Sequence, residues 1–520
     1  MDQPARSPTQ QAGRRHWWQS PMLAAALVLA SALPFVWPAL PPLVDLPAHM
    51  ARYRVALDVG ESAELQRYFG YHWRLMGNLG VDLLVQPLAR LIGLERAVKL
   101  IVLTLPALTA AGLLGVARAA HGRLPPTAML AVPFALSAPL LFGFVNFVAG
   151  AALALIVFAA WLRGRSGLLL LLAGPVLFAV HLYGWAMLGL WVAGAVIGEA
   201  AVARERASET LRLLVRATLP LAPVLLLVLI ARGSGGGPLA ETWFDGGQKL
   251  VSLMAALRDR WALLDLLPVV VVLVVLITGW RRLGVHPALA GAALLTGVAG
   301  LLLPYKLMGS AYADMRLYPY ALALAVLALR GDRLRPRSAQ MLATAALGCA
   351  LLRVGTVTAS NLVAHREQQE LLSALELMPA GARLATFVGQ DCEARWPMQR
   401  SAHLGAMVTV RRDGFSNDQW AASGLNLLER RYRPPGGFDS DPSQLVQPPG
   451  CVLSLTVDGA LAQFPREAFD FVWLIGTERP DPRLLAGLTP VWRGAGATLY
   501  RIVPDRGAAA RAAGKAERLR

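Results

Sequence analysis

Long apolar runs separated by short basic clusters dominate the chain of 520 residues. A bilayer core of about 30 Å requires roughly 20 apolar residues in a helix, and eleven segments approach that length. Hydrophobic residues make up 55% of the sequence and charged residues only 16%, which excludes a disordered chain and an ordinary soluble enzyme. We therefore expect an α-helical polytopic membrane protein. Its eleven predicted spans are 21–40, 97–117, 126–142, 144–162, 167–181, 183–201, 211–231, 262–280, 287–305, 317–330 and 339–359.

The basic residues indicate how these spans are oriented. A formal net charge of +17 is also typical of nucleic-acid-binding proteins, but here the charge lies in short clusters between apolar runs, so we expect no nucleic-acid partner. A cytoplasmic N-terminus makes six segments cytoplasmic, and together they carry seventeen basic and four acidic residues. The expected location is the bacterial cytoplasmic (inner) membrane, with a multi-pass topology. The six segments are 1–20, 118–125, 163–166, 203–217, 281–286 and 330–338.

The composition changes beyond residue 360, where polar residues and short β-rich runs replace the apolar segments. We predict a C-terminal extracytoplasmic α/β domain there, in which Cys392 and Cys451 either pair or remain free thiols. The predicted domains are a cytoplasmic N-terminus (1–20), a transmembrane domain (21–360) with a first outward loop (41–96), the α/β domain (361–505) and a disordered basic tail (506–520). The predicted elements are a helix over His365–Leu377, strands over Arg383–Val388, Val452–Val457 and Phe469–Ile475, and an edge strand over Ala497–Val503.

The first outward loop begins with a group of side chains suited to chemistry. Asp45 comes just before a helix-starting proline, and His49 and Arg52 follow within the next two turns. A carboxylate, an imidazole and a guanidinium above the membrane can bind a metal-pyrophosphate or accept a proton from a sugar hydroxyl. The structural alternative is that Asp45 only caps the helix and Arg52 only anchors a lipid headgroup.

The last outward loop carries Lys306, Asp314 and Arg316. Its two basic residues depart from the positive-inside trend, which favours a binding role, and phosphate is the natural partner for such a pair. The alternative is that Asp314 neutralises Arg316 in a plain salt bridge.

Three further polar positions are informative. His181, at the outer end of an apolar run, is either a substrate-binding residue or a histidine satisfied by packing. Asn146, in the Gly-Phe-Val-Asn-Phe hairpin, favours a structural role in its turn. His403 and the aromatic-rich stretch 411–420 suit carbohydrate, whose hydroxyls need hydrogen bonds and whose rings stack on tryptophan.

The whole arrangement resembles the GT-C superfamily of membrane glycosyltransferases, which have eight or more spans and a functional acid in the first outward loop. Asp45, in Pro-Pro-Leu-Val-Asp, is similar to that acid, which implies a role as base or as ligand of a divalent metal (Mg²⁺ or Mn²⁺). Many members have two adjacent acids, whereas Leu46 follows here, so the metal requirement stays open. The segments also resemble uncharacterised bacterial membrane proteins that share Asp-x-Pro-x-His-x-x-Arg and Tyr-x-Asp-x-Arg.

This resemblance implies transfer of a sugar from a polyprenyl-phosphate donor to a glycan, lipid or protein acceptor on the outer face of the membrane. Asp45 and His49 would be catalytic, and Arg52, His181, Lys306, Asp314 and Arg316 would bind substrate. Two alternatives belong to other classes. A lipid or small-solute transporter or flippase would show ionisable groups near mid-membrane and paired halves. A non-catalytic envelope-assembly protein would only bind a partner.

Overall fold

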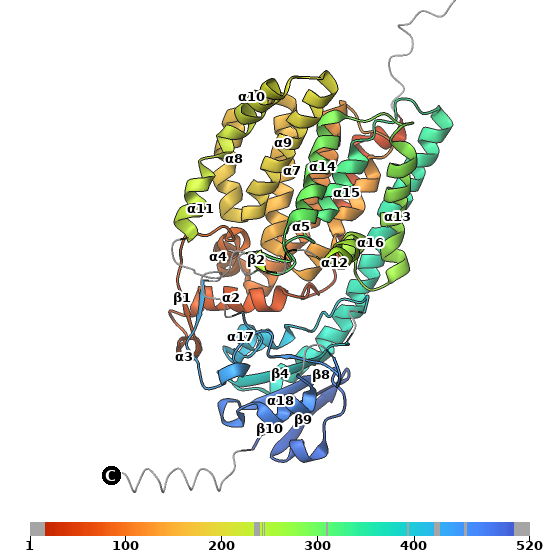
Figure 1. Cartoon of the computed structure of the whole chain (residues 1–520). Coiled ribbons are helices and arrows are strands. Elements are labelled where there is room, and N and C mark those ends of the chain that lie inside the picture. The colour runs from red at the N-terminus through yellow and green to blue at the C-terminus, as the bar shows by residue number, and fades with distance from the viewer. Residues whose placement is uncertain are drawn as a thin grey trace, which may run out of the picture.

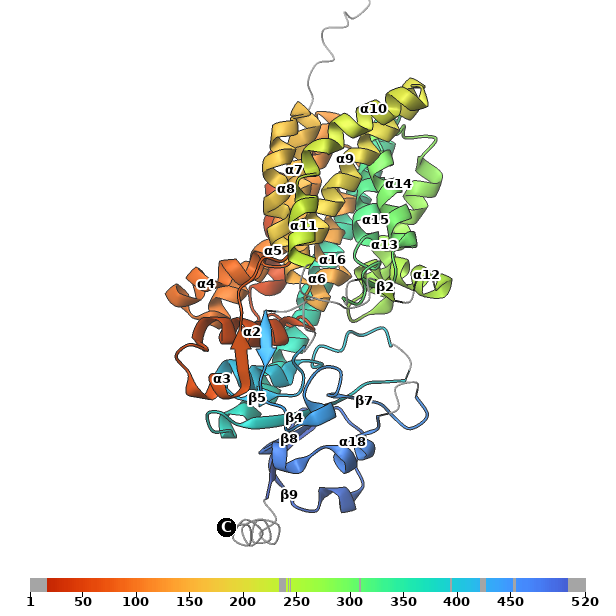
Figure 2. The same cartoon turned by 60° about the vertical axis from the view of Figure 1, so that its left-hand side comes forward.

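The computed structural model describes residues 16–232, 240–241, 243, 245–307, 310–392, 395–420, 427–451 and 455–503, so the predicted tail and most of the predicted N-terminus lie outside the described residues. Helices form a bundle, and a sheet lies beyond one end of it (Figure 1). Helix α2 (Leu46–Asp58) lies between bundle and sheet, and helix α10 (Ala207–Thr218) lies at the opposite end (Figures 1 and 2).

All eleven segments predicted to span the membrane contain helix. Five helices are long and apolar enough to cross a bilayer, and a helix pair bent by 54° at its break makes six if the pair is one span and not a re-entrant loop. The remaining five apolar helices have only 10–17 residues, fewer than a full crossing needs. The mostly helical, apolar fold is therefore as expected, whereas eleven full crossings stay a prediction. The five long helices are α5 (Leu94–His121), α7 (Val145–Gly164), α9 (Leu182–Ala203), α13 (Ala262–Gly279) and Pro336–Leu377; the bent pair is Ala207–Leu221 with Val224–Ala231; the short ones are Pro21–Phe35, Ala128–Phe142, Gly167–Val180, Pro287–Leu302 and Tyr318–Leu327.

Glycines bring α9 and α14 (Pro287–Leu302) close together. A Cβ on Gly291 would collide with the carbonyl of Gly194, and one on Gly198 would collide with the carbonyl of Pro287. Small residues allow two apolar helices to approach until their backbones are in van der Waals contact. Because α9 leads into α10, this contact also places the start of α14 at the α10 end of the bundle.

Helix α16 (Pro336–Ser373) runs unbroken from the bundle to the sheet (Figure 1). The sequence predicts two helices here, a span over 339–359 and a second helix over His365–Leu377. They form one helix, continued by a 3₁₀ turn, because no proline interrupts the chain before Pro379.

A buried ion pair joins α16 to α13. Arg353 Nη1 donates to Asp265 Oδ1 (2.7 Å), and both side chains are almost fully buried. Trp396, from the C-terminal part, donates its indole N–H to the other oxygen of Asp265 (2.7 Å). These bonds fasten the C-terminal part to the bundle.

The sheet has six strands, with β4 (Arg383–Gly389) at its centre. Strands β5, β7 and β8 run parallel to β4, whereas β10 runs antiparallel to both β8 and β9. Trp473 on β8 and Leu499 on β10 are buried in the core. The strand order is β5 (Phe415–Ser416), β4, β8 (Phe471–Ile475), β10 (Ala497–Ile502) and β9 (Leu488–Gly494), and β7 (Leu445–Val446) pairs with the end of β4.

Two sequence predictions are wrong in this part. Ala497–Val503 is not an edge strand, because β10 lies between β8 and β9; the proline and glycine in β9 had hidden the true edge strand. The predicted strand over Val452–Val457 is wrong at its C-terminal end, because Val457 begins helix α18 (Val457–Gln463), with Thr456 as its N-cap. Residues 452–454 lie outside the described residues.

A strand pairing and a disulfide connect loops near the sheet. Strand β1 (Phe69–Tyr71), in the first loop, pairs antiparallel with β6 (Leu428–Arg430). Cys392 and Cys451 form a disulfide, with a Cα–Cα distance of 5.0 Å, which decides between the two alternatives left by the sequence.

Candidate functional site

Asp45 holds the N-cap position of α2, but its side chain makes no capping hydrogen bond. Pro47 fixes the first turn instead, and the backbone N–H of Asp45 donates to the carbonyl of Phe142 (2.8 Å). The carboxylate is only 16% exposed. It is therefore positioned by its backbone and available for chemistry, contrary to the alternative that it serves only as a cap.

His403 lies beside this carboxylate, although the two residues are far apart in sequence. Its Nε2 is 3.7 Å from Asp45 Oδ1 and 3.9 Å from Asp441 Oδ1, while its Nδ1 lies 3.0 Å from the carbonyl of Asp418. Burial raises the pKa of Asp45 to about 6, although His403 opposes the shift. Burial also opposes protonation of His403, but Asp45 and Asp441 outweigh it and raise the pKa of the imidazole. Asp45 therefore changes between its protonated and ionised forms near pH 6, beside an imidazole whose charged form is favoured.

His49 lies one turn after Asp45, and Trp420 packs between it and His403. The ring centroids of His49 and Trp420 are 5.0 Å apart, and those of His403 and Trp420 are 4.9 Å apart. Burial, reinforced by the charge of Arg52, keeps the pKa of His49 well below its usual value. Its Nδ1 is buried without a hydrogen-bond partner among the described residues. A neutral imidazole in this place can donate or accept one hydrogen bond from a substrate.

Arg316 brings a positive charge to the same place. It is 6% exposed and lies over the ring of Phe144, with its Cζ 4.3 Å from the centroid. One terminal nitrogen donates to Ser310 Oγ (2.8 Å) and to the carbonyl of Ala311 (3.2 Å). Its Nε is buried with no partner, and within the described ranges it forms no salt bridge. Its charge is close enough to act on the pKa of Asp45, so an anion bound here would be held beside that carboxylate.

Asp314 does not neutralise Arg316. It pairs with Lys249 of helix α12 (Gly246–Met254), Nζ to Oδ2 being 2.7 Å, and both side chains are almost fully buried. Lys249 also donates to the carbonyls of Gly300 and Leu303. Asp314 thus forms a salt bridge with Lys249, and the alternative in which it pairs with Arg316 is wrong. Asp314 therefore does not neutralise the charge of Arg316.

Arg52 is engaged in a structural ion pair. Its Nε and Nη2 donate to the two oxygens of Asp82, each at 2.9 Å, and both side chains are buried. Asn146 donates to the same carboxylate (3.0 Å) and accepts from the N–H of Val81 (2.6 Å). Asn146 thus has the structural role expected for it, and Arg52 holds α2 to helix α4 (Gly80–Ile92) instead of anchoring a headgroup.

The other two predicted substrate-binding residues lie in separate elements. His181 is the N-cap of α9, and its Nδ1 accepts from the N–H of Tyr183 (3.2 Å). Lys306 lies in β3 (Lys306–Leu307), which pairs with β2 (Ala240–Glu241). The structure therefore brings together Asp45, His49 and Arg316, while Arg52 and Asp314 are held in ion pairs.

Sequence reasoning missed part of the site. His403 and Trp420 belong to the stretch singled out as suited to carbohydrate, but nothing local linked them to Asp45. Asp441 gave no signal at all. Lys249 could have been suspected, because it is one of only four lysines in the chain.

A metal ion does not fit this donor set. The imidazole stands between Asp45 and Asp441, and among the residues that the structure describes no group of three His, Cys, Asp or Glu side chains is placed to hold a metal. The chemistry proposed below therefore has no step through a metal.

The fold is similar to the crystal structure of ArnT from Cupriavidus metallidurans bound to undecaprenyl phosphate. The similarity covers 93% of this chain and 97% of ArnT, with a TM-score of 0.50 and a sequence identity of 14%. No protein-family model and no curated protein matches the chain. At this identity the likeness concerns the fold alone. The comparison therefore shows that this chain has an ArnT-like fold, as the resemblance inferred from the sequence implied.

Proposed function

We propose that the protein is a membrane glycosyltransferase that transfers a sugar from a polyprenyl-phosphate donor to a hydroxyl acceptor. The observation that carries this proposal is the juxtaposition of Asp45, an uncapped carboxylate with a raised pKa, and Arg316, a buried guanidinium without an ion-pair partner among the described residues. The similarity to a structure with bound undecaprenyl phosphate supports a lipid-phosphate donor.

The proposed reaction divides between these two residues. Asp45 accepts the proton of the acceptor hydroxyl, whose oxygen forms a bond to the anomeric carbon of the sugar. The bond from that carbon to the phosphate oxygen breaks, and its electron pair leaves with polyprenyl phosphate. Arg316 stabilises the charge on the leaving phosphate. The charge of His403 favours the ionised form of Asp45, which keeps that carboxylate ready to accept the proton, and Trp420 offers a ring face to the sugar.

We propose that the site lies on the extracytoplasmic side of the membrane and that the N-terminus is cytoplasmic. The disulfide Cys392–Cys451, on the sheet side, is typical of an oxidising compartment. The predicted basic segments include α10, which lies at the opposite end of the bundle. The acceptor class, whether glycan, lipid or protein, is left to experiment.

Arg316→Gln tests the donor site. Hydrogen bonds to charged groups contribute about 1.5–3 kcal/mol, so we expect transfer to fall by about ten- to a hundredfold. Membranes containing the protein would receive polyprenyl phosphates that carry radiolabelled hexose, pentose or aminosugar, and loss of label from the lipid would be measured. Arg212→Gln, which removes an exposed charge at the α10 end, is the matched control and should keep full activity. If the wild-type protein releases no label from any donor, or if Arg316→Gln equals the control, the proposal is wrong.

The transfer rate should also depend on pH. Asp45 must be ionised to accept a proton, and its pKa is about 6, so the rate should fall as the pH drops below about 6. The measurement is the initial rate between pH 5 and pH 8 with saturating donor. A rate that stays constant from pH 7 to pH 5 would show that Asp45 is not the base.

A further inference from the structure

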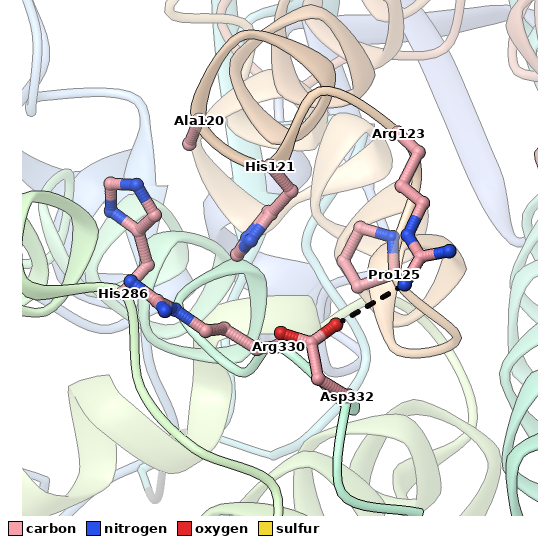
Figure 3. A pocket seen from close by; sticks show the side chains of 7 residues that line it. All are labelled: Ala120, His121, Arg123, Pro125, His286, Arg330 and Asp332. Carbon is pink, nitrogen blue, oxygen red and sulfur yellow. Dashed lines mark hydrogen bonds and ion pairs between the residues drawn. The ribbon is translucent and has the colours of Figure 1, made fainter. Parts of the chain in front are cut away.

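A cavity of about 190 Å³ lies far from Asp45, at the α10 end of the bundle. His286 is the N-cap of α14, whose first turn packs against Gly198 near the end of α9. Helix α9 has 22 residues and therefore spans about 33 Å between this end and His181. The cavity is thus separate from the proposed active site. Its lining residues are Ala120, His121, Arg123, Pro125, His286, Arg330 and Asp332 (Figure 3).

Three inter-helix connections build the cavity, and hydrogen bonds hold them together. His286 donates its backbone N–H to the carbonyl of Ala328 (2.8 Å), and Arg330 donates its own to the carbonyl of Gly284 (3.0 Å). The Nε2 of His121 lies 2.8 Å from the carbonyl of Leu327. The backbone of the lining residues is therefore held by three connections and does not depend on a single loop.

The lining is rich in N–H donors and positive charge. Two guanidinium groups and two imidazoles face one carboxylate, and that carboxylate, Asp332, lies 3.4 Å from Arg123. Arg330 is exposed, and its guanidinium makes no hydrogen bond or ion pair with any described residue, whereas the Nδ1 of His286 is buried without a hydrogen-bond partner among those residues. In Figure 3 the imidazoles and Arg330 lie together on one side, and the Arg123–Asp332 pair lies on the other.

An anion would satisfy these groups. Buried polar nitrogens are normally hydrogen-bonded, and guanidinium groups prefer the oxygens of phosphate or carboxylate. The cavity is much larger than the roughly 10–15 Å³ that one water needs, so it has room for more than solvent. Basic pockets between membrane helices are known places for lipid phosphates.

We propose that this cavity binds a phosphate group, with Arg330 and His286 as its principal donors. The phosphate can come from the headgroup of an anionic phospholipid in the adjacent leaflet or from a soluble phosphate ester. The site would stabilise the three connections at this end of the bundle, independently of the transfer reaction.

The test uses the full chain in nanodiscs of neutral phosphatidylcholine. Phosphatidylglycerol is added in one arm and inorganic phosphate in the other, and binding is measured by native mass spectrometry and by the shift of the thermal unfolding temperature. We expect Arg330→Gln to weaken binding about tenfold or more, because it removes the charged donor. Arg333→Gln, an exposed neighbour that does not line the cavity, should bind like the wild type.

His286→Asn is a second variant, chosen because asparagine keeps a good N-cap for α14 while it shortens the reach into the cavity. Binding of phosphatidylglycerol alone would assign the lipid as source, and binding of inorganic phosphate would assign a soluble one. The proposal is overturned if neither probe binds, or if both cavity variants bind as tightly as Arg333→Gln.

Discussion

Asp45→Asn should reduce sugar transfer by at least about a hundredfold, the lower range of what a positioned general base contributes. The amide has almost the same volume as the carboxylate but cannot accept the acceptor's proton. The fold should survive, because Asp45 caps α2 through its backbone alone and its side chain makes no capping hydrogen bond. The measurement is release of label from the donor lipid at pH 7.

The thermal stability of Asp45→Asn separates lost chemistry from lost folding. Burial raises the pKa of Asp45 from 3.8 to about 6, so any stability that comes from its protonated form is present below pH 4 and lost as the pH rises through 6. At pH 7 the variant should therefore unfold at a temperature no lower than the wild type. Asp58→Asn, in the last turn of α2, is the matched control and should transfer sugar normally. Full activity of Asp45→Asn would remove Asp45 from the mechanism.

Asp82→Leu should lower the free energy of unfolding by about 3–5 kcal/mol, because it leaves Arg52 as a buried charge without its counterion. The same change also removes the carboxylate to which Asn146 donates. The double variant Arg52→Met/Asp82→Leu removes both charges and should recover much of this loss, since well-packed apolar residues often replace a buried pair without penalty. Titration of the purified protein with SDS in mixed micelles measures the difference.

An exposed ion pair provides the comparison for this experiment. Glu209→Gln removes the partner of Arg212 on the surface of α10 and should change stability by less than about 1 kcal/mol. If Asp82→Leu is as stable as Glu209→Gln, the Arg52–Asp82 pair does not hold α2 to the bundle. Arg52 would then again be a candidate for contact with substrate, the role that the sequence suggested for it.

Local sequence patterns were sufficient to locate the long apolar helices. They were not sufficient to identify which side chains the polar residues of those helices and their loops contact. Apolar length located a helix in each of the eleven predicted spans, because burial in a membrane or a core requires it whatever the tertiary arrangement, but it gave no sign of short helices such as α12 and α18. The partner of Asp314 could not be found in this way, since Lys249 lies 65 positions earlier and only the docking of α12 brings the two together. His403 reaches Asp45 across most of the chain for the same reason.

Strands and helix ends show the same limit. Strand β9 was not among the predicted strands; it contains Pro490 and Gly494, and a proline is tolerated in an edge strand whose N–H groups have no partner to bond. The polar residues after 360 suggested that the last span ended there, but polar residues do not terminate a helix, and α16 continues to Ser373.

The length of α16 has a mechanical consequence. With 38 residues, α16 is about 57 Å long. Arg353 ties it to Asp265 of α13 near its midpoint, and its C-terminal end leads into the sheet. The β1–β6 pairing is a second tie between the bundle side and the C-terminal part, so both attachments have to give way before that part can move away from the bundle.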